Sequence, residues 1–179
     1  NLVQKMPDGA GGFFYAYYQV TSSFVDLLGF TDGTNHTPYD VPYRQFTFPS
    51  TYNTTFSGTS VMHFTFPFPT PPNDSARIKI TTHYSSLIDG WGDVTTPAGT
   101  YGSLRQRLIA DQADSTFLHD TSTNTWTWDG TPPAPNAADT GYNWVAKTTK
   151  FNVAGISIND PGNLPAATGT YLLAVVSKL

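Results

Sequence analysis

The sequence contains no glutamate, and all 13 of its acidic residues are aspartate. Glutamate is one of the straight-chain residues that fill exposed helix faces, whereas aspartate favours turns and helix caps. We therefore expect very little helix. The absence also narrows the chemistry, because any pair of carboxylates for acid–base or glycosidase catalysis would have to be two aspartates.

Cysteine is absent as well. This excludes disulfide bonds, thiol nucleophiles and thiolate metal ligands. A chain of 179 residues can bury a sizeable core without such crosslinks, so the absence does not indicate a compartment. No run approaches the roughly 18 apolar residues of a membrane-spanning helix, and we expect no membrane insertion.

Positive charge is scarce. The chain has 9 Lys and Arg against 13 acidic residues, with a net charge of −4 and a pI near 5.3. Only Arg105 and Arg107 bring two arginines close together in the sequence. Nucleic acids and anionic membranes attract basic patches, so we expect neither to be a partner.

The residues that are abundant favour strands and turns. Aromatic residues make up 15% of the chain, which also contains 15 Gly and 14 Pro. The clearest alternation of apolar and polar residues is at 78–84, between turn signals on both sides. The predicted strands are residues 13–20, 43–48, 62–68, 78–84, 103–110 (with a helix as the alternative), 125–128 and 170–176. About ten short strands predict a single all-β domain over residues 1–179, an antiparallel β-sandwich of jelly-roll or Ig-like type.

Two segments carry a resemblance to a known family. Residues 48–56 read FPSTYNTTF, and residues 89–107 read DGWGDVTTPAGTYGSLRQR. These segments, followed by YNW at 142–144 and KFNV at 150–153, resemble a family of secreted β-domains of unknown function. Members of that family precede the C-terminal sorting domain in cargo of the type IX secretion system. The resemblance covers residues 40–155.

The resemblance implies location and architecture without a reaction. It implies that the chain is part of a longer precursor, exported through the outer membrane to the cell surface or the medium. It also implies O-glycosylation at an Asp, then Ser or Thr, then an apolar residue or Thr. Ser75 and Ser115 lie in sequences of this kind. The family has no established catalytic residues to carry over.

Residues 89–92 read Asp-Gly-Trp-Gly and predict a turn in which Trp91 folds over a strand end. The functional alternative makes Asp89 and Asp93 ligands of a calcium ion, although the spacing of an EF-hand loop is missing. His63 and His83 fall on the polar faces of their predicted strands. A metal site between these two histidines is the alternative to ordinary exposed histidines.

The tryptophans offer the strongest hint of a binding function. Trp126 and Trp128 share one face of their predicted strand, and Trp144 follows Tyr142 at the same spacing. Exposed aromatic rings stack on sugar rings, so these three tryptophans are candidates for glycan binding. The alternative places them in the core. We expect Trp128, beside an Asp-Gly turn, to be the most exposed of the three.

No motif specifies catalysis, since there is no Gly-x-Ser-x-Gly elbow and no glycine-rich phosphate loop before a helix. We expect a non-catalytic structural or adhesive module, secreted or on the cell surface, that assembles through its strand edges. Its partners would be other surface proteins or a second copy of itself, and its only candidate cofactor is calcium. A glycan-binding module is the first alternative. A hydrolase is the second, and it would need two aspartates within about 10 Å of each other.

Overall fold

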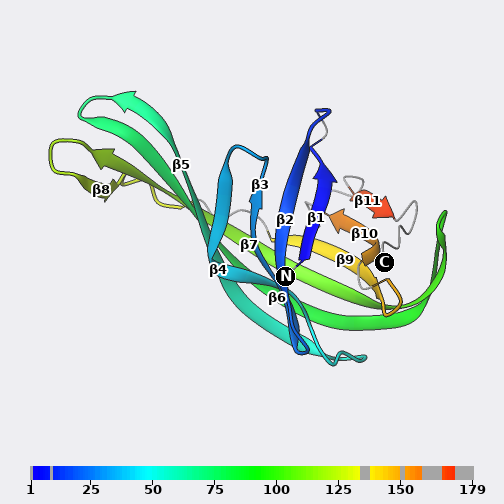
Figure 1. Ribbon diagram of the computed structural model, residues 1–179. Helices are drawn as coiled ribbons and strands as arrows, with labels where there is room; N and C mark the ends of the chain where they lie inside the picture. Colours follow the sequence, from blue (N-terminus) through cyan, green and yellow to red (C-terminus); the bar gives the residue numbers. More distant parts are fainter. Residues whose placement is uncertain (1, 9, 134–137, 150–151, 159–166, 172–179) are drawn as a thin grey trace. The chain divides into compact units, whose positions relative to one another are not determined.

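The structure is a computed structural model that describes residues 2–8, 10–133, 138–149, 152–158 and 167–171, the last range by its backbone alone. Every regular element in these ranges is a β-strand, so the described residues include no helix that could cross a membrane. The eleven strands, labelled in Figure 1, are β1 (Leu2–Pro7), β2 (Phe13–Val20), β3 (Phe24–Thr31), β4 (His36–Thr47), β5 (Thr55–Thr70), β6 (Asn73–Thr96), β7 (Gly99–Asp120), β8 (Thr125–Trp128), β9 (Asp139–Ala146), β10 (Asn152–Ile158) and β11 (Ala167–Tyr171).

The all-β prediction is confirmed, and residues 103–110 are strand rather than helix. The predicted strand at 170–176 begins within β11, and its residues 172–176 lie outside the described residues. Residues 150–151, which belong to the resemblance to secreted β-domains, also lie outside them.

Consecutive strands are hydrogen-bonded neighbours along most of the chain, and every described pairing is antiparallel.

The chain divides into two compact units. Unit 1 comprises Asn1–Phe48, Gly58–His83 and Gln112–Asn136, and unit 2 comprises Pro49–Ser57, Tyr84–Asp111 and Ala137–Leu179. The long strands β5, β6 and β7 each contribute residues to both units. The single domain expected from the sequence remains a prediction.

In unit 1 the strand order runs from β1 to β8 without interruption. The pairing of β3 with β4 shifts register near Gly29, whose φ is +156°. A Cβ at this position would lie 2.6 Å from the backbone oxygen of Thr37, so the close approach of the two strands requires glycine. In the core of this unit, Asp26 is buried and accepts two hydrogen bonds from Arg44, at 2.8 and 3.0 Å. This bidentate pair satisfies the buried carboxylate.

In unit 2 the order is β5, β6, β7, β9, β10, β11. Its buried side chains include Ile88, Ala146 and Val153. The Gln106 amide donates to the buried Ser86 hydroxyl at 2.9 Å. Ser86 and Ile88 lie two residues apart on β6, so they share one side of that strand.

The predicted turn at residues 89–92 is wrong, because these residues continue β6 and the turn falls at Pro97 and Ala98. Asp89 is tied across to β7 by Arg105, and the carbonyl of Gly92 accepts a hydrogen bond from Ser103 at 3.1 Å. Cross-strand hydrogen bonds therefore hold the segment extended. Gly92 has a φ of +152°, which residues with a side chain rarely adopt.

Candidate functional site

One side of unit 2 carries polar and aromatic side chains on three adjacent strands, β6, β7 and β9. The β7–β9 register places Arg105 opposite Trp144 and Arg107 opposite Tyr142. Since side chains two residues apart point to the same side of a strand, Arg105 and Arg107 share a face. Two hollows lie along this face, each beside one of these arginines.

The first hollow, which we call the aromatic hollow, has a volume of about 280 Å³ and is lined by Gly90, Trp91, Gly92, Asp93, Arg105 and Trp144. Trp91 is 78% exposed, so the expectation that it folds over a strand end is wrong. Trp144 is half-buried and Asp93 is exposed. Two indole rings, a carboxylate and a guanidinium therefore surround a space that is open to solvent.

Arg105 is held in place by two neighbours. Its Nε donates to Asp89 Oδ1 at 2.8 Å, and its guanidinium lies 5.5 Å from the centre of the Tyr142 ring. The hydrogen bond from Arg105 to Asp89 raises the pKa of Arg105, so the side chain stays cationic. Its hydrogen-bonding groups are therefore presented to the aromatic hollow with little freedom left to lose on binding.

The same ion pair bears on the calcium hypothesis. The Asp89 carboxylate already accepts a hydrogen bond from the Arg105 guanidinium, and the Asp89 side chain is only 17% exposed. Among the residues that the structure describes, no group of three or more histidine and acidic side chains is placed to hold a metal ion. Calcium at Asp89 and Asp93 stays a prediction, and it would have to displace or share the contact with Arg105.

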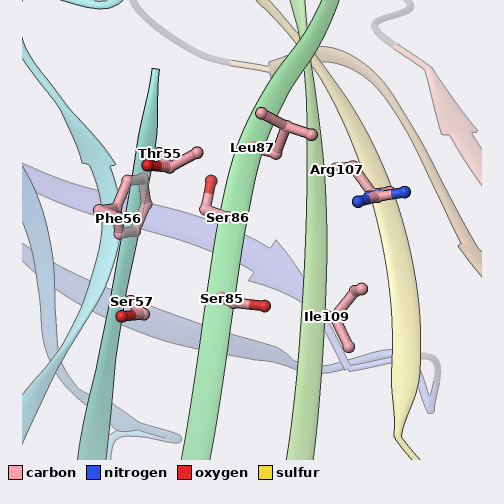
Figure 2. Close-up of a pocket in the computed structure, with 8 residues that line it drawn as sticks. All are labelled: Thr55, Phe56, Ser57, Ser85, Ser86, Leu87, Arg107 and Ile109. Carbon is pink, nitrogen blue, oxygen red and sulfur yellow. The ribbon is translucent and has the colours of Figure 1, made fainter. Parts of the chain in front are cut away.

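The second hollow, which we call the hydroxyl hollow, has a volume of about 570 Å³. Figure 2 shows its lining on the neighbouring strands β5, β6 and β7, namely Thr55, Phe56, Ser57, Ser85, Ser86, Leu87, Arg107 and Ile109. The volume lies within the range of about 300–1,000 Å³ that is typical of small-molecule sites. The Arg107 Nε is buried and has no hydrogen-bond partner among the described residues.

The other two tryptophan candidates lie on β8 in unit 1. Trp126 is half-buried, with the Arg77 guanidinium 4.1 Å from its ring centre and the His119 ring at 5.0 Å. Trp128 is 47% exposed, in agreement with the expectation for it. The structure thus gathers Trp144 with Asp93 in unit 2, while Trp126 and Trp128 belong to unit 1.

Three histidines of unit 1 each face a different partner. His63 Nδ1 lies 2.8 Å from Asp40 Oδ2, and His83 Nδ1 lies 3.0 Å from the Thr59 hydroxyl. His119 contacts Asp74 at 2.7 Å, and this contact raises the pKa of His119 and lowers the pKa of Asp74. These contacts occupy one ring nitrogen of His63 and one of His83, the pair considered for a metal site.

Both serines considered for glycosylation lie in strands rather than loops. Ser75 is in β6 and Ser115 is in β7, and each is half-buried. The aspartate before Ser75 is the one that contacts His119, and Asp114 accepts a hydrogen bond from Gln112 at 2.9 Å. Modification at either serine remains a prediction.

Comparisons with models of protein families, with curated proteins and with solved structures find no match for this chain. The sequence patterns did not single out Trp91 and Arg107, which line the two hollows, as candidates. The available signal was the period-two spacing of Asp89, Trp91 and Asp93, which places all three on one face once residues 89–92 are taken as strand.

Proposed function

We propose that this chain is a non-catalytic adhesive module that binds saccharides through the aromatic hollow. The observation that carries the proposal is Trp91, which is 78% exposed and shares the hollow with Trp144, Asp93 and Arg105. A large aromatic side chain left in water beside a second one is the kind of surface that marks a binding site.

The chemistry of the hollow fits a sugar. One face of a pyranose ring is apolar and buries against an indole, while its hydroxyls need both donors and acceptors. Asp93 supplies an acceptor and Arg105 supplies donors. Because Asp89 and Tyr142 restrain Arg105, less conformational entropy is lost when the sugar binds.

The cellular setting and the finer fold belong to the same proposal. The resemblance of residues 48–56 and 89–107 to type IX cargo domains supports an extracellular or cell-surface location reached through the outer membrane. Alternate residues of β6 are buried, with Tyr84, Ser86 and Ile88 covered and Ser85 exposed. One-sided burial supports a β-sandwich, because a buried sheet face needs a second layer to cover it.

The test is binding of the purified chain to an array of neutral and acidic oligosaccharides, followed by calorimetry on those that bind. Trp91→Ala should weaken binding by about tenfold or more, since truncating a central aromatic contact typically costs over 1 kcal/mol. Trp128→Ala is the matched control, because Trp128 is also exposed but belongs to unit 1. It should leave binding unchanged.

Three outcomes would count against this proposal. Failure of every oligosaccharide to bind would remove it, and equal loss in the Trp91 and Trp128 variants would remove the aromatic hollow as the site. Release of reducing ends from a bound oligosaccharide would instead favour the hydrolase alternative.

A second candidate function is assembly with further copies of the chain through β1. Among the described strands, β1 pairs only with β2. The cross-strand pairs on one face of these two strands include Val3 with Tyr17 and Pro7 with Phe13. Val3, Phe13 and Tyr17 are 52%, 47% and 39% exposed. Lys5 lies between Val3 and Pro7 on this face, with its ammonium 3.7 Å from the centre of the Phe13 ring. The apolar residues and the open edge of β1 are suited to pairing with another chain, and Lys5 is the one charge on this face of β1.

A further inference from the structure

Arg107 differs from the other arginines in what surrounds it. Arg44 and Arg105 each bond a carboxylate, and Arg77 lies over the Trp126 ring. In the part of the chain that the structure describes, the buried Nε of Arg107 has no hydrogen-bond partner. A buried donor without an acceptor is unfavourable, and more so when it belongs to a charged group. A negative charge placed beside this guanidinium by a ligand would offset part of this cost.

The surroundings of Arg107 suit an anion. The described lining of the hydroxyl hollow contains no acidic side chain, and Thr55, Ser57 and Ser85 contribute hydroxyl groups to it. Hydroxyls can donate to an oxyanion, and a guanidinium binds carboxylate or sulfate through parallel hydrogen bonds. Figure 2 shows these groups on the three neighbouring strands β5, β6 and β7.

The hydroxyl hollow is a neighbour of the aromatic hollow. Arg105 lines one and Arg107 lines the other, and the two arginines are separated by one residue on β7. Two residues of a strand span about 7 Å, which is comparable to the size of one sugar unit. An oligosaccharide stacked on Trp91 can therefore place a substituent of an adjoining unit near Arg107.

We infer that the module prefers acidic oligosaccharides, and that Arg107 binds their carboxylate or sulfate group in the hydroxyl hollow. The inference rests on the proposed saccharide-binding function and adds the class of ligand. The uncharged part of the oligosaccharide binds in the aromatic hollow. The anionic substituent contacts Arg107 and so determines the preference for acidic over neutral oligosaccharides.

The experiment compares three probes by calorimetry: a neutral galacto-oligosaccharide, an oligogalacturonate of equal length and a sulfated galacto-oligosaccharide. The native chain should bind at least one acidic probe about tenfold or more tightly than the neutral one, as expected for one charge-assisted contact. The acidic probe that binds more tightly than the neutral one shows whether Arg107 binds a carboxylate or a sulfate. Arg107→Gln should abolish the preference and leave binding of the neutral probe unchanged.

Lys147→Gln is the matched control, since it removes one positive charge at an exposed position of unit 2. It should retain the preference for the acidic probe. Arg107→Lys keeps the charge but lacks the planar guanidinium, so we expect an intermediate preference. Thermal unfolding without ligand provides a second readout, in which Arg107→Gln should be at least as stable as the native chain.

The outcomes separate this inference from the proposed function. Equal binding of neutral and acidic probes, with loss only in Trp91→Ala, would overturn the role of Arg107 and leave saccharide binding intact. An acidic preference that persists in Arg107→Gln would also overturn it. A marked loss of ligand-free stability in Arg107→Gln would indicate that Arg107 has a structural role. Failure of all three probes to bind would overturn this inference, and failure of the array oligosaccharides as well would overturn both.

Discussion

At the scale of single residues, several polar side chains are satisfied by specific near neighbours. Asp32 is an example, because its carboxylate accepts hydrogen bonds from the backbone of Thr34 and Asn35, at 2.8 and 2.6 Å, and from the Asn35 amide. These bonds, led by those from Asn35, lower the pKa of Asp32 to about 2. The ionised carboxylate of Asp32 therefore stabilises the turn between β3 and β4.

The His119–Asp74 pair predicts a pH-dependent stability. The pKa of His119 is raised by Asp74, so the stabilisation is complete below the unfolded value of about 6.5 and is lost as pH rises through the folded pKa. The pKa of Asp74 is lowered by His119, so the stabilisation that the ionised Asp74 contributes is lost as pH falls through that lowered pKa. The native chain should therefore exceed His119→Gln in melting temperature most clearly at about pH 5, and less at about pH 8.

Asp74→Asn provides the partner measurement, because it removes the carboxylate and keeps the imidazole. At about pH 5 it should lower the melting temperature as much as His119→Gln does. The double variant should lower the melting temperature little more than either single variant. A difference between native and variant chains that is equal at both pH values would contradict the ion pair as its source.

At the scale of elements, strand pairing overrides local turn signals. β6 runs from Asn73 to Thr96 through an Asp-Gly-Trp-Gly sequence that by itself predicts a turn. Its partner β7 supplies Arg105 and Ser103, whose hydrogen bonds keep the segment extended. This continuation is what brings Trp91 and Asp93 beside Trp144 in the aromatic hollow.

The exposed edge strand β1 yields a prediction about assembly. If copies pair through β1, Val3→Lys should shift the chain from oligomer to monomer, because a second charge beside Lys5 on this exposed edge opposes strand pairing. Light scattering coupled to size-exclusion chromatography measures this at a fixed concentration. Ile156→Lys, at an exposed apolar position of β10, is the control and should leave the mass unchanged. A native chain that is monomeric at every concentration would exclude the assembly.

At the scale of the whole molecule, three strands continue from one unit into the other. β5, β6 and β7 each contribute residues to unit 1 and to unit 2. We expect thermal unfolding followed by far-ultraviolet circular dichroism and by tryptophan fluorescence to give a single coincident transition, as for one cooperative domain. Two separated transitions would mean that the units are independent domains and that the single-domain prediction is wrong.

The sequence by itself determined the class of fold. The absence of Glu and the period-two runs at residues 62–68 and 78–84 predict strands, and the structure has strands there. These signals are local, since they depend on backbone preference and on the alternation of side chains along one segment. For the same reason, the exposure of Trp128 beside its Asp-Gly turn could be anticipated.

The tertiary structure alone decided where the strands end and which side chains meet. Residues 89–92 became strand because β7 bonds to them, and Trp91 stayed exposed because no described neighbour covers most of its ring. The buried, unpartnered Nε of Arg107 is likewise a property of the packed strands β5, β6 and β7. Such contacts join residues far apart in the chain, so no pattern within a single segment encodes them.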